Sequence, residues 1–205
     1  MTAPSDPPVL PPTKANIDAC RRCELWQEGT QGVPGAGSPR ATVLLVGEQP
    51  GDEEDRQGLP FVGPAGLLLQ RAMADAGLKP GETFLTNAVK HFHNEPRGKR
   101  RMHKTPAQRH IEACRGWLEQ EIARVGPRVI VALGATALNS VMGAKLKVGE
   151  ARERTLRHAS GTPVIASYHP SAALRAPEKD ARDALYATIV GDLRKASRLA
   201  ARDKG

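Results

Sequence analysis

Residues 41–46 read Ala-Thr-Val-Leu-Leu-Val, a continuous, largely apolar run that stops at Gly47. A run of this kind favours a strand that is buried on both faces, as in a parallel sheet. Similar strands are expected at 83–89, 128–133 and 163–167. Helical patterns separate them, and this alternation predicts an α/β fold, a three-layer αβα sandwich with a central, mainly parallel four-stranded sheet. The helices are expected at 64–76, 106–125, 134–142 and 178–200.

The parts of the chain outside this alternation are short of regular patterns. Residues 1–14 are rich in proline and predict a disordered tail, which leaves 15–205 as a single domain. A short helical or loop segment is expected from Cys20 to Gly32. Residues 91–105 are polar and basic and predict a long loop, followed by a helix with Thr105 as its N-cap. Residues 144–162 are charged and irregular.

Composition narrows the classes of partner. The 205 residues carry a formal net charge of +8, which favours a polyanion such as nucleic acid. No apolar run approaches the ~20 residues that span a bilayer, and the N-terminus lacks a secretory apolar region. We therefore expect a cytoplasmic protein without a membrane partner. Three cysteines, an odd number, do not indicate a disulfide framework, so they are free or bind a metal.

Unusual polar residues follow the predicted strands, and parallel sheets place their sites at the carboxyl ends of strands. These residues fall within 47–52, 87–103 and 169–171. The first segment, Gly-Glu-Gln-Pro-Gly-Asp, has a tight backbone whose amides can face a ligand. It lacks the Lys-Ser/Thr pair of a phosphate-binding loop and the glycine spacing of a dinucleotide fold. An ordinary turn with an exposed acid is the competing interpretation.

Three side chains on this rim suit a planar ligand. Phe61 lies on a rigid loop and can stack on a base, unless it is simply a core residue. Asn87 offers a donor and an acceptor that can read a pyrimidine edge, although asparagine is also common in turns. His169 can stabilise negative charge on a departing group, or it can be structural.

The run from Lys99 to Lys104 is the strongest basic patch. Contact with DNA phosphates is its obvious use, and a solvated charged loop is the alternative. His103 lies among these cations, which disfavour its protonated form and should lower its pKa. A neutral imidazole is a competent nucleophile.

The cysteines form a possible metal set. Cys20 and Cys23 are a two-residue-spaced pair, and Cys114 lies on a predicted helix. A fourth ligand must be another residue type, with His91 and His110 as candidates. Spacing alone leaves open which histidine binds, and whether the metal is zinc or an iron–sulfur cluster. Free cysteines with an accidental spacing are the third alternative.

Four motifs together resemble the uracil-DNA glycosylase superfamily. They are 47–51 (GEQPG), 61–66 (FVGPAG), 86–90 (TNAVK) and 169–171 (HPS), and they resemble most the iron–sulfur branch, family 4. Two features depart from that branch. His91 stands where family 4 usually has cysteine, and the insertion Lys-Arg-Arg-Met-His at 99–103 is also foreign to it. Both resemble the UdgX-type subgroup, which bonds covalently to the abasic sugar of DNA.

The resemblance implies a DNA-repair hydrolase that excises uracil from DNA, as a monomer that prefers single strands. It makes His91 the fourth ligand, beside Cys20, Cys23 and Cys114, of a [4Fe–4S] cluster. It makes His103 a nucleophile that stays bonded to the sugar, so that each molecule turns over once, with Glu48 orienting it or accepting its proton. His169 stabilises the uracil anion. The remaining assignments are uracil binding by Gln49, Asp52, Phe61 and Asn87, and DNA binding by Lys99, Arg100, Arg101 and Ser171.

Two other functions remain open from the sequence. One is an ordinary multiple-turnover uracil-DNA glycosylase, in which His103 only contacts phosphate. The other is a non-catalytic iron–sulfur DNA-binding domain. Release of free uracil separates the second from both enzymes, and a denaturant-stable protein–DNA band separates the covalent enzyme from the ordinary one.

Overall fold

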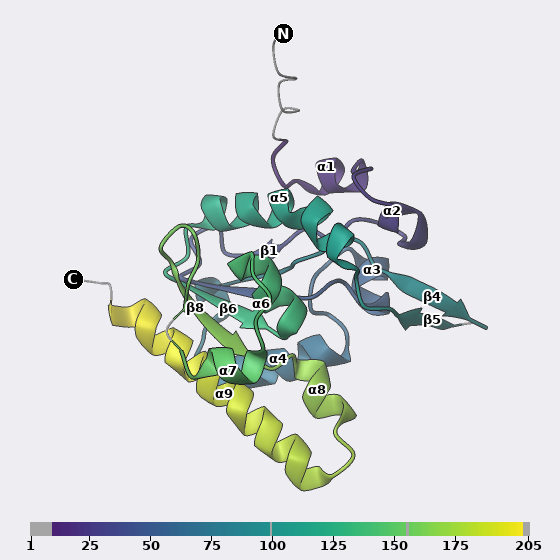
Figure 1. The fold of residues 1–205 in the computed structure, drawn as a ribbon. Helices are drawn as coiled ribbons and strands as arrows, with labels where there is room; N and C mark the ends of the chain where they lie inside the picture. Colours follow the sequence, from purple (N-terminus) through teal and green to yellow (C-terminus); the bar gives the residue numbers. More distant parts are fainter. Residues whose placement is uncertain (1–9, 99, 155, 203–205) are drawn as a thin grey trace.

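The computed structural model describes residues 10–98, 100–154 and 156–202 (Figure 1). Most of the tail predicted at 1–14 lies outside these residues, and Lys14 already begins the helix α1, Lys14–Asp18. Two short helices, α2 (Leu25–Glu28) and α3 (Asp52–Gln57), come before and after the first long strand.

The four predicted strands are confirmed, and they lie side by side in parallel. They are β2 (Val43–Gly47), β3 (Thr83–Asn87), β6 (Val129–Leu133) and β8 (Pro163–Ser167). The sheet has the order β1-β3-β2-β6-β8-β7, because a short antiparallel strand is added at each edge. These strands, β1 (Ala36–Gly37) and β7 (Leu156–Arg157), are two residues long and have no apolar pattern that could predict them.

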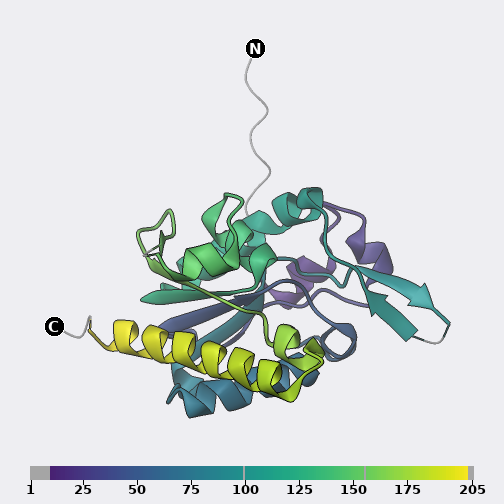
Figure 2. The same cartoon turned by 60° about the horizontal axis from the view of Figure 1, so that its bottom comes forward.

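Helices cover both faces of this sheet, so the three-layer prediction is confirmed (Figures 1 and 2). One face packs its apolar side chains against α4 (Pro64–Asp75) and α9 (Lys179–Arg202). The other packs against α5 (Gln108–Val125), α6 (Ala135–Met142) and α7 (Val148–Arg152). Burial on both faces explains why the strands β2 and β6 are almost purely apolar.

The segment 91–105 differs from the predicted loop. It contains a β-hairpin of β4 (Asn94–Arg97) and β5 (Arg100–His103), which projects from the side of the domain (Figures 1 and 2). The predicted cap at Thr105 is also wrong. The N-cap of α5 is Ala107, whose backbone N–H donates to the His110 ring.

Two further short elements flank the parallel strands. A single 3-10 turn, η1 (Pro80–Glu82), leads into β3, and the helix α8 (Pro170–Arg175) follows β8. No helix in the described part of the chain is long and apolar enough to cross a membrane.

Candidate active site

A cavity of about 580 Å³ lies at the carboxyl ends of the parallel strands. Its wall receives residues that follow β2, end β3, follow β6 and follow β8, together with the loop before α4. The sequence places its unusual polar residues on this same rim, and the structure brings most of them together. The predicted site residues on the cavity wall are Glu48, Gln49, Phe61, Asn87, His103, His169 and Ser171.

Gly47 packs closely against Asn87 and Phe61, two residues of the cavity wall. A Cβ atom at this position would clash with the Asn87 side-chain oxygen and lie 2.6 Å from Phe61 Cζ. Phe61 itself has a φ of 57°, in the left-handed region that a bulky residue rarely adopts. Its ring belongs to the hydrophobic core and also lines the cavity, 6.4 Å from the His169 ring in a stacked arrangement. Phe61 is thus a core residue that also lines the cavity, and its stacking on a base stays a prediction.

Asn87 is buried at the end of β3, and its side-chain amide makes no hydrogen bond to any of the residues described by the structure. Its backbone carbonyl accepts from the Lys90 ammonium at 2.9 Å. Lys90 forms a buried ion pair with Glu121 of α5, with an N···O distance of 2.6 Å. The Lys90–Glu121 pair thus holds the backbone of the turn after β3, and the Asn87 side-chain amide has no partner among the described residues that would turn it away from the cavity.

His169 is held as a neutral hydrogen-bond donor. Burial, aided by the nearby charge of Arg175, lowers the pKa of this imidazole to about 4. Its Nδ1 accepts from the backbone N–H of Ser171 at 3.2 Å. In the neutral ring the proton must then lie on Nε2, which is free to donate to a ligand in the cavity.

His103 reaches the same cavity from the end of β5, with half of its side chain exposed. Its Nε2 lies 3.3 Å from Glu48 Oε1. Partial burial lowers the pKa of His103, with Arg175 and His93 adding to the effect and Glu48 opposing it. The ring is therefore neutral by preference, as expected, but burial and Arg175 are the main causes rather than the cations of its own loop.

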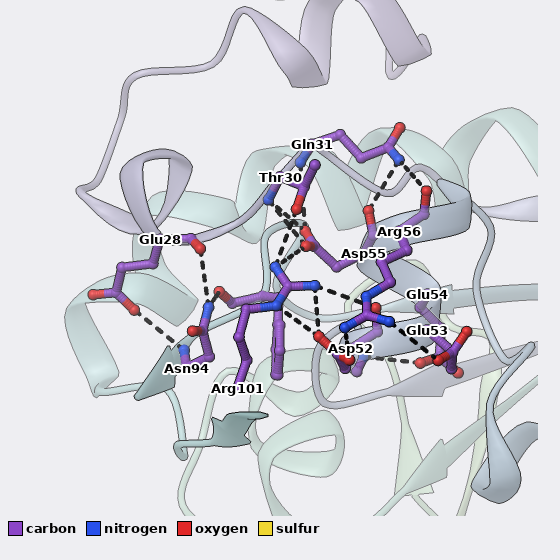
Figure 3. A network of polar contacts seen from close by, with 12 residues as sticks. Glu28, Thr30, Gln31, Asp52, Glu53, Glu54, Asp55, Arg56, Asn94 and Arg101 are labelled. Atoms are coloured by element: carbon purple, nitrogen blue, oxygen red, sulfur yellow. Dashed lines mark hydrogen bonds and ion pairs between the residues drawn. The ribbon is translucent and has the colours of Figure 1, made fainter. Parts of the chain in front are cut away.

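Arg101 and Asp52 have other partners than those expected from the sequence. The Arg101 guanidinium lies between Asp52 of α3, with an N···O distance of 2.6 Å, and the buried Asp55, at 2.5 Å (Figure 3). Asp52 does not line the cavity. Gln49 lines it, but its amide bonds to the backbone of His93 and Lys104. The hairpin that carries His103 is thus anchored by Asp52 and Asp55, which bind its Arg101, and by Gln49, which binds the backbone at both of its ends.

The other predicted DNA-binding residues are Lys99, Arg100 and Ser171. Arg100 is exposed, which suits contact with a phosphate. Lys99 lies outside the described residues. Ser171 lines the cavity, and its hydroxyl bonds to His169 Nδ1 at 2.8 Å.

The three cysteines converge near one turn of α5. Cys23 packs against the buried cluster that holds Cys114. The interaction of the two thiols lowers the pKa of Cys23 to about 6 and, with burial, raises that of Cys114. The indole N–H of Trp117 donates to Cys20 Sγ at 3.4 Å. Thiols brought together from opposite parts of the chain have the donor chemistry that an iron–sulfur cluster requires.

The two histidines that are candidates for a fourth ligand differ in their surroundings. Both ring nitrogens of His110 are used, by Ala107 and by Glu24, which disfavours it as a ligand. His91 is buried and lines a different cavity, beside Asp18 and Trp26. Among the described residues, no group of three or more histidine, cysteine, aspartate or glutamate side chains is arranged to hold a metal ion.

Glu54, Tyr168 and Arg175 are among the residues of the cavity wall that the sequence did not indicate. Glu54 lines it and accepts from the backbone N–H groups of Gly51 and Gly63. Tyr168 precedes His169, and Arg175 ends α8. The position of Arg175 one helical turn beyond the His-Pro-Ser motif is the one signal that could have located it.

Comparison with known proteins assigns the family. The model of the uracil DNA glycosylase superfamily matches residues 34–194, which include every residue of the cavity wall. This chain belongs to the uracil-DNA glycosylase superfamily. A type-4 uracil-DNA glycosylase from Pyrobaculum aerophilum is 39% identical in an alignment of 168 positions that covers 78% of this chain and 82% of the relative. A type-4 enzyme from Thermotoga maritima is 37% identical over 160 residues, 78% of this chain and 80% of the relative.

A type-5 uracil-DNA glycosylase from Pyrobaculum aerophilum is also similar, at 30% identity in an alignment of 184 positions that covers 80% of this chain and 76% of the relative. The type-4 relatives agree with the branch that the motifs indicate. The finer assignment to the UdgX-type subgroup stays a prediction, and it depends on His91 and on residues 99–103.

Proposed function

We propose that this superfamily member is a DNA-repair uracil-DNA glycosylase of the type-4 kind. The observation that carries the proposal is the convergence of Phe61, Asn87 and His169 on one cavity at the carboxyl edge of the sheet. The cavity supplies a stacking surface, an unengaged amide and a neutral imidazole donor. These are the elements needed to hold a pyrimidine and to stabilise it as a leaving group.

The base is recognised after it leaves the DNA stack. Phe61 stacks on the ring, and the Asn87 amide pairs its donor and acceptor with the uracil edge. His169 donates its Nε2 proton in a hydrogen bond to a uracil oxygen. As the bond between C1′ and uracil N1 breaks, the electron pair passes to the base, and this hydrogen bond strengthens with the growing negative charge.

We infer further that His103 is the group that attacks C1′. A ring nitrogen of His103 forms the new bond with its lone pair, uracil leaves as the anion, and the ring proton passes to Glu48. The supporting geometry is the 3.3 Å contact between His103 and Glu48 on the cavity wall, together with a hairpin anchored through Arg101. In the alternative enzyme a water molecule attacks C1′, and His103 contacts phosphate.

The first test concerns base recognition. Asn87→Ala should lower kcat/KM for uracil release by the equivalent of about 1–3 kcal/mol, the usual value of a bidentate base contact. Release of uracil from single-stranded DNA, measured at several substrate concentrations, gives this value. Asn16→Ala is the matched control, since Asn16 does not line the cavity and its amide donates to the Pro11 backbone carbonyl. Equal release of uracil and thymine by the wild-type protein would contradict the proposed function.

We also propose a [4Fe–4S] cluster on Cys20, Cys23, His91 and Cys114. The convergence of the three thiols at α5 and the likeness to type-4 enzymes support it. When bound, the cluster would supply a covalent crosslink between the N-terminal segment, the residues before the hairpin and α5. The protein residues alone bring these segments together through Trp117 and the Lys90–Glu121 pair.

The second test concerns this cluster. Purification without air should give about four irons per chain and visible absorption from thiolate-bound iron. Cys114→Ala and His91→Ala should lose iron, whereas His110→Gln should keep it. Zinc in place of iron would contradict the cluster. Loss of iron in the His110 variant alone would contradict His91 as the ligand.

The expected partner is uracil-containing DNA. A preference for single strands, a monomeric state and a cytoplasmic location remain predictions of the sequence.

A further inference from the structure

Both carboxylate oxygens of Glu48 have partners, and the two partners come from different parts of the fold. The Thr136 hydroxyl donates to Oε2 at 2.5 Å. His103 Nε2 lies 3.3 Å from Oε1. Glu48 is therefore a bridge between α6 and the hairpin, with one oxygen held from each side.

The position of Thr136 is fixed by the chain around it. Thr136 is the second residue of α6, in the first turn after β6. Gly134, before the helix, has a φ of 91°, and a Cβ there would lie 3.2 Å from the His169 Cβ. Gly134 and Ala135 both line the cavity, so the start of α6 forms part of its wall. The N-terminus of a helix also favours a nearby carboxylate.

We propose that Thr136 is a positioning residue for the attack by His103. By holding one oxygen of Glu48, the hydroxyl fixes the rotation of the carboxylate so that the other oxygen faces the imidazole. This proposal rests on the proposed covalent function, because it assigns to Glu48 the task of accepting the His103 proton. Without Thr136, the carboxylate can turn away, and the attack loses its proton acceptor.

A plain structural role predicts something different. A threonine in the first turn of a helix can simply stabilise that helix, and its loss would then lower the free energy of unfolding without changing how the sugar reacts. The division of reacted DNA between protein-bound and released product separates the two roles. Stability alone does not move this ratio.

The experiment compares Thr136→Val with Thr136→Ser and the wild type. Valine keeps the shape and removes the hydroxyl, whereas serine keeps the hydroxyl. A hydrogen bond to a charged group is typically strong enough that Thr136→Val should slow formation of the boil-stable adduct about tenfold or more. The division of reacted DNA should shift from protein-bound toward released product to match. Thr136→Ser should stay within about twofold of the wild type, which is the scatter of a weakly perturbed hydrogen bond. Thr188→Val is the control, since Thr188 donates to a backbone carbonyl within α9.

A second measurement does not depend on activity. Glu48 raises the pKa of His103, against the effects of burial, Arg175 and His93. If Thr136 holds Glu48 in place, Thr136→Val should lower the His103 pKa measured by NMR, and Glu48→Gln should lower it too. Either an unchanged adduct rate or an unchanged His103 pKa in Thr136→Val would overturn the proposal.

The two levels of the proposal fail in different ways. If the wild-type protein forms no adduct, the covalent function is overturned, and the NMR titration alone decides whether Thr136 positions Glu48. If the wild type forms the adduct and Thr136→Val forms it equally fast, the role of Thr136 is overturned while the covalent function stands.

Discussion

His169→Ala is expected to slow uracil release in a single turnover by about 10²- to 10³-fold, equivalent to about 2.7–4 kcal/mol of lost transition-state stabilisation. The reason is that Nδ1 accepts from the Ser171 backbone, which leaves the Nε2 proton for the departing base. The donor is already oriented before uracil arrives, so its hydrogen bond costs little reorganisation as charge develops.

The variant should leave DNA binding largely intact, because the lost contact matters most in the transition state. Quenched-flow release of labelled uracil measures the rate, and a filter-binding assay measures the affinity. His158→Ala is a suitable control, since it removes a buried imidazole that bonds to Ser160 outside the cavity wall. An unchanged release rate in His169→Ala would make His169 a structural residue.

The low pKa of His169 fixes the sign of its pH effect. With a pKa of about 4, the ring is neutral above about pH 5, and its donor role does not change as the pH rises to 8. As the pH falls through about 4, the ring becomes protonated, and Nδ1 can no longer accept from Ser171. Ionisation near 6.5 in the wild-type pH profile should therefore come from groups other than His169.

The sheet could be predicted because strands that are buried on both faces appear in the sequence as continuous apolar runs. Residues 43–46 and 129–133 are apolar at every position, and a strand between two helical layers needs nothing else. The hairpin at 94–103 could not be predicted in this way. Its strands pair Glu95 with Met102 and Arg97 with Arg100, so no alternation of apolar and polar residues marks them.

The candidate site also contains residues that could be predicted from the sequence and contacts that could not. Phe61, Asn87 and His169 could be placed together because each belongs to a segment at the carboxyl edge of the sheet. The partners of Arg101 could not, because Asp55 lies 46 positions away and is buried. A basic run does not by itself show which of its cations have carboxylate partners elsewhere in the chain. The contact of Thr136 with Glu48 could not be predicted either, since a threonine early in a helix is common and does not indicate a partner.

His103→Ser is expected to abolish the denaturant-stable protein–DNA adduct completely. The protein is incubated with uracil-containing single-stranded DNA, boiled in detergent and run on a gel. The wild type should give a shifted band and His103→Ser none, while some uracil release by water attack should remain. Arg100→Ala is the matched hairpin control, since loss of an exposed cation should weaken binding, most clearly at high salt, without removing the nucleophile.

The physical case for a covalent product depends on what His103 needs and what the fold provides. Attack on an oxocarbenium-like carbon needs a lone pair more than a strong base. Burial lowers the pKa of His103 and so favours the neutral ring, which has a lone pair on one nitrogen. Attack also needs position, which the hairpin supplies through Arg101 and its two aspartates. Once the ring proton has passed to Glu48, the substituted imidazole is neutral and a poor leaving group, so hydrolysis should be slow. A wild-type protein without the boil-stable band, or a His103→Ser variant that keeps it, would show that His103 is not the nucleophile.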